Sequence, residues 1–213
     1  MCIRDRECTS ATTSVVDSGY YVGFFTSITV GADGLPIMSY KDSFNQYLKV
    51  AHCSDLECTS ATTTTIDSGF EVGFFTSIAV GADGLPIISY AGHFDSLKVA
   101  HCSNLACTSA TKSVVETKDY SVSFTSITVG ADGLPVISYQ DWTTDDLKVA
   151  HCSDLLCTSA TLTAVDTGGD VGSYCSITVG ADGLPVISSY DDTNDDLKVV
   201  HCGNVFCIPY ARR

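Results

Sequence analysis

Basic residues are scarce in this chain of 213 residues, and arginine is almost absent from it. Eleven lysines and arginines stand against 25 aspartates and glutamates, which gives a formal net charge of −14 at pH 7. Nucleic-acid binding needs clustered positive charge, so nucleic acid is excluded as a partner. Arginine occurs only near the two ends, at Arg4, Arg6, Arg212 and Arg213. A sialidase-type site, where several arginines converge on a substrate carboxylate, is therefore excluded as well.

Long apolar runs and the common catalytic motifs are also missing. No run approaches the roughly 18 apolar residues that cross a bilayer, and no basic amphipathic helix that could lie on one is present, so we expect no membrane insertion. Gly-x-Ser-x-Gly, His-Glu-x-x-His and phosphate-loop motifs do not occur. Aspartate is abundant, but no carboxylate pair stands in the apolar setting that would raise one pKa for glycoside hydrolysis. These absences predict a protein that is not an enzyme.

The sequence instead contains a repeat of about 50 residues, a period typical of stacked or radial arrays. Gly-Ala-Asp-Gly-Leu-Pro begins at Gly31, Gly81, Gly130 and Gly180, and Leu-Lys-Val-(Ala/Val)-His-Cys begins at Leu48, Leu97, Leu147 and Leu197. We interpret residues 7–207 as one array with units at about 8–57, 58–106, 107–156 and 157–207. Residues 1–6 match no unit and resemble the translation of a sequencing adaptor, and residues 208–213 form a tail.

Each unit predicts four short strands. In the first complete unit, Thr26–Val30 alternates polar and apolar residues, and Gly31–Gly34 can form a tight hairpin to a second strand at Leu35–Tyr40. A third strand is expected at Leu48–Cys53 and a fourth at Cys58–Ile66. Four antiparallel strands per unit of this length are typical of a propeller blade. The fold class is therefore an all-β propeller of four four-stranded blades, with a β-solenoid or stacked-hairpin array as the alternative.

The strand order leaves open whether the propeller closes. The chain begins with a fourth-strand segment at about residues 8–16 and ends after the third strand of the last unit. That segment could complete the last blade and close a four-bladed ring, which would bring Val15 close to Val199. We favour an open arc belonging to a larger propeller.

The repeated segments carry a family resemblance. The units resemble those of bacterial secreted proteins that combine Gly-x-Asp-Gly-Leu-Pro-x-Ile-Ser-Tyr with Leu-Lys-Val-Ala-His-Cys, over residues 7–207. The resemblance implies a propeller fold and brings no particular activity with it.

Eight of the eleven cysteines form four Cys-x4-Cys pairs at the turn between the third and fourth strands. Hairpin ends face each other at the distance that a disulfide needs, so we expect a disulfide in each unit and an oxidising, extracellular or cell-surface location. Zinc is the rival interpretation, but His52 and Cys53 are adjacent on a strand and point to opposite faces. Cys175 replaces a repeated Thr and is predicted to be a buried free thiol. The predicted pairs are Cys53–Cys58, Cys102–Cys107, Cys152–Cys157 and Cys202–Cys207.

The variable positions fall in two sets of loops, which follow the second and fourth strands and emerge on one face. The second-strand loops of the third and fourth units are rich in carboxylates, and aromatic rings stack on sugars while carboxylates bind hard cations. Asp192, Asn194 and Asp196 follow the alternating pattern of a calcium loop without its Gly and distal Glu, so we expect no cofactor, and calcium bound at these residues would be held weakly. The predicted ligand-binding patch comprises Asp141, Trp142, Asp145, Asp146, Asp191, Asp192, Asn194 and Asp196.

Three functions remain at this stage. The first is a noncatalytic extracellular recognition or surface module that binds a glycan or an extracellular protein through the variable loop face. The alternatives are a fragment of a polysaccharide-active propeller enzyme and a purely structural spacer.

Overall fold

The computed structural model describes residues 11–92, 96–117 and 122–208, and this part of the chain is all-β. No helix in it could span a membrane. Residues 1–6, Cys2, Cys8 and the tail beyond residue 208 lie outside the described residues.

Consecutive antiparallel strands form four sheets, which are the blades of a propeller. The first blade comprises β1 (Val22–Val30), β2 (Pro36–Asp42), β3 (Tyr47–Cys53) and β4 (Ala61–Asp67); the second, β5 (Phe74–Val80), β6 (Pro86–Ala91), β7 (Leu97–Cys102) and β8 (Ala110–Glu116); the third, β9 (Val122–Val129), β10 (Pro135–Asp141), β11 (Asp146–Cys152) and β12 (Ala160–Asp166); the fourth, β13 (Val171–Val179), β14 (Pro185–Asp191) and β15 (Asp196–His201).

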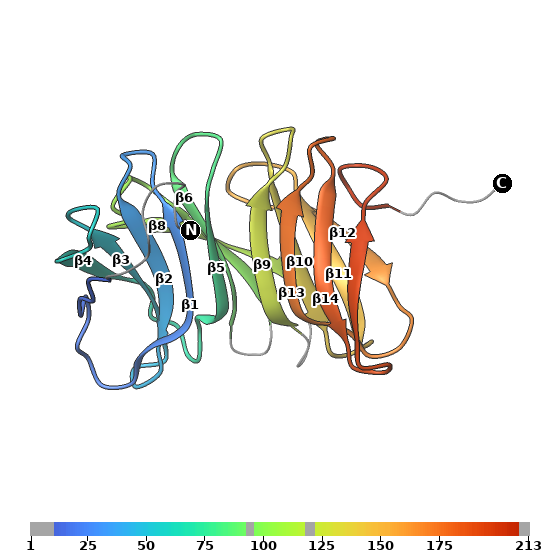
Figure 1. Cartoon of the computed structure of the whole chain (residues 1–213), viewed down its shortest axis with the longest axis horizontal. Coiled ribbons are helices and arrows are strands. Elements are labelled where there is room, and N and C mark those ends of the chain that lie inside the picture. Colours follow the sequence, from blue (N-terminus) through green and yellow to red (C-terminus); the bar gives the residue numbers. More distant parts are fainter. Residues whose placement is uncertain (1–10, 93–95, 118–121, 209–213) are drawn as a thin grey trace.

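The blades stand side by side in chain order, with the first and the fourth at opposite ends (Figure 1). The first strand of each blade contacts the first strand of the next, so that β1, β5, β9 and β13 form the inner row. The sheets do not close into a ring, and Val15 lies against Met38 and Tyr40 of the first blade. The propeller prediction is confirmed, and the structure is consistent with the open arc.

The strand boundaries differ from the predicted ones for a local reason. β1 begins at Val22 rather than Thr26, because the chain passes through a bulge at Phe25, whose φ of 52° is left-handed, and continues the strand beyond it. β4 begins at Ala61 rather than Cys58, because Cys58 also has a left-handed φ of 52° and its amide donates to the Asp55 carbonyl across the turn at 3.2 Å.

The blades adhere through one apolar interface that recurs along the chain. Leu48 and Val50 of the first blade pack on Ile78 and Ile88 of the second, and the two residues from the first blade are fully buried. The same positions meet between the second and third blades and between the third and fourth. Burying each such side chain stabilises the fold by about 1.5–3 kcal/mol. No blade can bury this surface alone.

Hydrogen bonds along the inner row connect each blade to the one before it. The repeated Thr-Ser-Ile segment accounts for them, since the Ile amide donates to the Ser hydroxyl of the preceding blade and is thereby satisfied. These bonds join Ile78 to Ser27, Ile127 to Ser77 and Ile177 to Ser126, each at 3.2 Å.

Cys175 is a buried free thiol, as predicted. Its Sγ donates to the Phe124 carbonyl at 2.8 Å, in place of the bond that the Thr125 hydroxyl makes to the Phe75 carbonyl at 2.7 Å one blade earlier. Burial raises the pKa of the Cys175 thiol to about 12 and keeps the proton on it.

The four predicted disulfides are all present, with Cα–Cα distances of 4.8–4.9 Å. The neighbouring histidines do not join them. Each imidazole reaches back to the Asp of its own Gly-Ala-Asp-Gly hairpin, which ties the third strand to the first turn of the blade. The Nε2–Oδ2 distances are 2.9 Å for His52–Asp33, His101–Asp83 and His151–Asp132, and 2.8 Å for His201–Asp182.

Peptide mapping under non-reducing conditions tests the disulfide pairing. Every Cys-x4-Cys pair should appear linked within its own blade, because each closes a loop whose ends already face each other. A link between two blades, or free thiols at these positions in the oxidised protein, would contradict the structure.

Replacement of Cys175 tests the bond to the Phe124 carbonyl. Cys175→Thr should preserve the melting temperature or raise it, because a hydroxyl replaces the thiol donor. Cys175→Val leaves the buried carbonyl unpaired, which costs about 1–3 kcal/mol. At about 2–4 °C per kcal/mol for a chain of this size, the valine variant should melt several degrees lower in calorimetry. Equal melting temperatures for the two variants would show that the bond contributes nothing.

Candidate ligand-binding site

A pocket of about 410 Å³ opens between the third and fourth blades, on the face that carries the variable loops. Its wall combines carboxylates, aromatic rings and neutral polar groups. The lining residues are Phe124, Gln140, Trp142, Asp145, Asp170, Ser173, Tyr174 and Asp192.

Backbone hydrogen bonds tie together the three loops that supply the carboxylates. Asp145 lies in the turn between β10 and β11 with a left-handed φ of 57°, and its carbonyl accepts a bond from the Val171 amide at 2.9 Å. Asp192 follows β14, and its amide donates to the Asp170 carbonyl at 2.9 Å. Asp145, Asp170 and Asp192 are consequently held around one opening although they come from different loops.

Gln140 is only 3% exposed, and its side-chain amide connects three other residues of the pocket. Its Nε2 donates to Asp170 Oδ1 at 3.0 Å, and its Oε1 accepts bonds from Trp142 Nε1 at 2.6 Å and from the Ser173 hydroxyl at 3.3 Å. The indole N–H is thus satisfied while 57% of the Trp142 side chain remains exposed. An aromatic ring held in this way offers a face on which a sugar can stack.

The electrostatics of the pocket raise the pKa of Asp170. Partial burial raises the pKa of this carboxyl above its ordinary value of 3.8, and repulsion from Asp145 and Asp192 raises it further. The bond from Gln140 opposes the shift without cancelling it. The pocket therefore places a weakened acid beside other carboxylates.

A row of aromatic rings leads from this pocket along the inner strands. Each ring sits at a left-handed residue, with φ of 50–52°, at the bulge of its strand. Successive ring centroids are 4.8 Å apart for Phe25–Phe75, 4.8 Å for Phe75–Phe124 and 4.4 Å for Phe124–Tyr174. A second cavity of about 270 Å³ runs along this row and shares Phe124 and Tyr174 with the first. Left-handed aromatic residues are uncommon, and their recurrence presents one ring per blade to the concave side.

The structure does not bring all residues of the predicted patch together. Trp142, Asp145 and Asp192 line the pocket. Asp141 and Asp191 are buried at the ends of β10 and β14 and hold their own loops: Asp141 accepts the Thr143 amide at 2.9 Å and pairs with Lys148, while Asp191 accepts the Asn194 side-chain amide at 3.0 Å and pairs with Lys198 at 3.3 Å. Asp146 and Asp196 begin β11 and β15, opposite Asp141 and Asp191.

The calcium interpretation gains no support from this geometry. Among the described residues, no group of three or more His, Cys, Asp or Glu side chains is arranged to hold a metal ion. The Asn194 side chain, one of the three predicted ligands, is bonded to Asp191 instead. A site formed by Asp192, Asn194 and Asp196 stays a prediction.

Several pocket residues did not belong to the predicted patch: Phe124, Gln140, Asp170, Ser173 and Tyr174. A signal for two of them was present as a departure from the repeat. Tyr174 stands where the other units have Phe, and Gln140 stands where they have Lys, Ala or Tyr. No signal marked Ser173, which acts only through its contact with Gln140.

Comparison with solved structures supports the propeller fold. No family model and no curated protein matches the sequence. Among solved structures, the chain resembles an exo-β-1,3-galactanase from Phanerochaete chrysosporium in complex with galactose (TM-score 0.62, 10% identity, covering 95% of this chain and 52% of that one). It also resembles an endo-arabinase from Bacteroides thetaiotaomicron (TM-score 0.59, 12% identity, 92% and 81%) and a GH43 β-1,3-galactosidase in complex with galactodeoxynojirimycin (TM-score 0.56, 9% identity, 83% and 70%). At these identities the likeness establishes the β-propeller fold alone.

Replacement of Asp170 tests the electrostatics of the pocket. When folding raises the pKa of a carboxyl group, the ionised carboxylate destabilises the native state at neutral pH. This destabilisation vanishes at a pH low enough to protonate the group in both the folded and the unfolded state. Asp170→Asn should therefore raise the melting temperature slightly at pH 7. The gain should disappear below about pH 4.

Asp154 provides the control of opposite sign. Hydrogen bonds from the Thr158 side chain and backbone lower the pKa of the Asp154 carboxyl, so Asp154→Asn should lower the melting temperature at pH 7. A melting temperature that falls in both variants would contradict the assignment for Asp170.

Proposed function

We propose that this protein binds a carbohydrate in the pocket between its third and fourth blades. The observation that carries the proposal is the arrangement of Trp142, whose indole N–H is fixed by the buried Gln140 while its ring stays exposed in a pocket that three carboxylates also line. Carbohydrate sites pair an aromatic platform with polar groups that bind hydroxyls, and Asp145, Asp170 and Asp192 supply such acceptors. The glycan-related names of the structural neighbours support this substrate class.

The setting of the site is proposed to be extracellular. Four disulfides in a protein of this size support an oxidising compartment. A glycan of a cell wall or matrix is therefore the proposed partner, rather than an intracellular metabolite.

Glycoside hydrolysis is the second candidate function, and Asp170 is the observation that favours it. Hydrolysis of a glycosidic bond uses one carboxyl group that keeps its proton and one that is ionised. The raised pKa of Asp170 suits the proton donor, and Asp145 or Asp192 would act as the ionised partner. The expectation of a protein that is not an enzyme stays untested, and the hydrolase names of the neighbours support the polysaccharide-active alternative.

Binding to β-1,3-galacto-oligosaccharides and arabino-oligosaccharides tests the first proposal. Trp142 is the only tryptophan, so its fluorescence reports directly on the pocket. We expect at least one of the two sugars to quench or enhance the fluorescence in a saturable way. Calorimetry should show an affinity about tenfold lower for Trp142→Ala, because stacking contributes on the order of 1–2 kcal/mol.

Phe44→Ala is the matched control, since Phe44 is a comparably exposed aromatic residue in the equivalent loop of the first blade. The control variant should bind like the unmodified protein. Equal loss of affinity in both variants, or no binding of either sugar, would contradict a site at Trp142.

Release of reducing sugar from the same oligosaccharides distinguishes the two functions. If the protein is a hydrolase, Asp170→Asn should abolish release while leaving binding within a few-fold. Glu57→Gln is the control, because Glu57 is exposed in the turn between β3 and β4 of the first blade, and this substitution should leave both unchanged. Binding without release by the unmodified protein would leave recognition as the function.

A further inference from the structure

The two ends of the arc expose apolar surfaces that are buried at every internal blade interface. Leu197 and Val199 of β15 are 79% and 64% exposed, whereas Leu147 and Val149, at the same positions of the third blade, are fully buried. At the opposite end, Ile28 of β1 is 64% exposed. The fourth blade thus bears one half of the recurring interface, and the first blade bears the other half.

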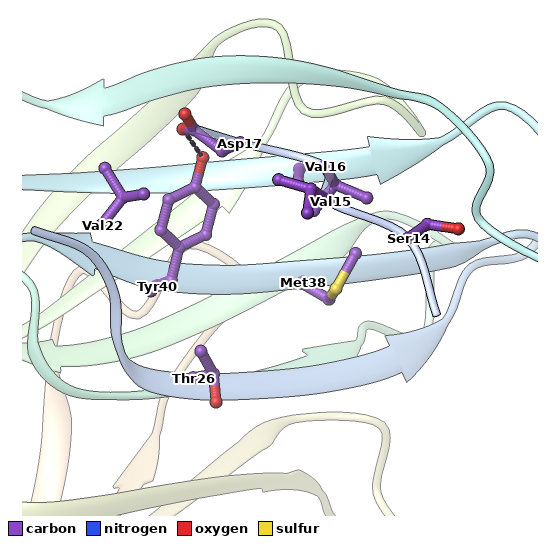
Figure 2. Close-up of a pocket in the computed structure, with 10 residues that line it drawn as sticks. Ser14, Val15, Val16, Asp17, Val22, Thr26, Met38 and Tyr40 are labelled. Atoms are coloured by element: carbon purple, nitrogen blue, oxygen red, sulfur yellow. Dashed lines mark hydrogen bonds between the residues drawn. The ribbon is translucent and has the colours of Figure 1, made fainter. Parts of the chain in front are cut away.

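Residues 11–17 stand at the repeat position of a fourth strand but pair with no sheet of the described structure. They correspond to Ala61–Asp67, which form β4, yet no strand is formed by residues 11–17. Asp17 nevertheless makes the contacts of its counterpart. It accepts a bond from the Tyr40 hydroxyl at 2.6 Å (Figure 2) and another from Lys49 Nζ at 2.5 Å. Asp67 contacts Tyr90 and Lys98 of the second blade in the same way, at 2.8 and 3.4 Å.

A cavity of about 290 Å³ lies between this segment and the first blade. Val15 and Val16 form one side, and Met38 and Tyr40 form the other (Figure 2). At the internal interfaces, the Leu and Val of a preceding third strand occupy this position. The cavity therefore has the location and the apolar lining to receive a pair of such side chains.

Glycine geometry supports the same correspondence. A Cβ built on Gly73 would lie 3.0 Å from Leu48 Cα, and one on Gly172 would lie 3.0 Å from Leu147 Cα, because the third strand of the preceding blade passes that close. Gly23 has the same left-handed backbone, with φ of 88°, but nothing lies within 4 Å of the Cβ position. Gly23 therefore leaves room for the third strand of a preceding blade, and no such strand lies there in the described part of this chain.

The exposed surfaces at the two ends of the described arc are complementary. β15 pairs with β14 on one edge, and its other edge carries no strand among the described residues. We propose that two copies of this chain associate head to tail, with residues 11–17 of one copy pairing as the fourth strand on β15 of the other. Leu197 and Val199 of that copy then fill the cavity over the first blade. The first and fourth blades lie at opposite ends of one arc, so a second copy and not the same one supplies the partner (Figure 1).

The internal pairing fixes the expected register. Val50 stands opposite Thr64 and His52 opposite Thr62 in the first blade. The repeat offset then places Val199 opposite Ser14, and His201 opposite Thr12, across the two copies. Since the two joined surfaces differ, the interface is heterologous and either closes a ring or extends into a filament.

Light scattering coupled to size exclusion tests the association with the full chain. The protein should form dimers or larger species whose population rises with concentration. Val199→Asp should raise the dissociation constant of this association at least tenfold. It should not lower the melting temperature of the monomer, because Val199 is exposed there. Val114→Asp is the control, since Val114 is 51% exposed on β8 of the second blade, away from both ends of the arc, and this variant should associate normally. A monomer at all concentrations overturns the proposal.

Cross-linking distinguishes two copies from one closed chain. Ser14→Cys and Val199→Cys are prepared as separate chains of different mass, in a background where Cys2 and Cys8 are serine. After mixing and air oxidation, a disulfide between the two different chains should dominate, and neither chain alone should cross-link to the same extent. A double variant that forms only an intramolecular disulfide would indicate ring closure within one chain and overturn the proposal, as would the absence of any cross-link.

Discussion

Every level of this structure depends on the contact between neighbouring blades. A blade of four short strands has apolar residues on both faces and buries them only when another blade covers them. Leu147 and Leu197 occupy the same repeat position, but one is fully buried and the other is 79% exposed, and the difference is the presence of a following blade. The stability of the fold is therefore a property of interfaces rather than of individual sheets.

This dependence separates positions that must repeat from positions that can vary. The Thr-Ser-Ile segment and the Leu-Lys-Val strand recur because each contributes to an interface, through bonds such as Ile177 to Ser126 or through burial. The loops that follow the second and fourth strands are held across the interfaces through backbone groups, as in the bond from the Val171 amide to the Asp145 carbonyl, so their side chains are free to diverge. Two adjacent divergent loops meet at an interface that is itself rigid, which explains why a pocket with fixed carboxylates forms between the third and fourth blades.

The sequence was sufficient for the propeller fold, the strand count per blade and the four disulfides, because these follow from short-range patterns repeated at a fixed period. It was sufficient for Trp142, Asp145 and Asp192 as pocket residues, because the loops that carry them are visibly enriched in aromatic and acidic residues. It was not sufficient for Gln140, whose role comes from bonds to Asp170 and Trp142 that only the folded chain brings together. It also gave no means to separate Asp141 and Asp191, which stabilise their own loops, from carboxylates that face a ligand.

The placement of the disulfides has a mechanical consequence. Each one closes a loop of a few residues inside a single hairpin, and among the described residues none joins one blade to the next. Under tension applied at the chain ends, none of these four disulfides resists the separation of neighbouring blades, so only noncovalent contacts and the connecting backbone hold them together, and we expect the array to yield by peeling from an end, one blade at a time. Each hairpin that peels away keeps its own crosslink, so it retains a compact tip from which the blade can reform when the load is removed.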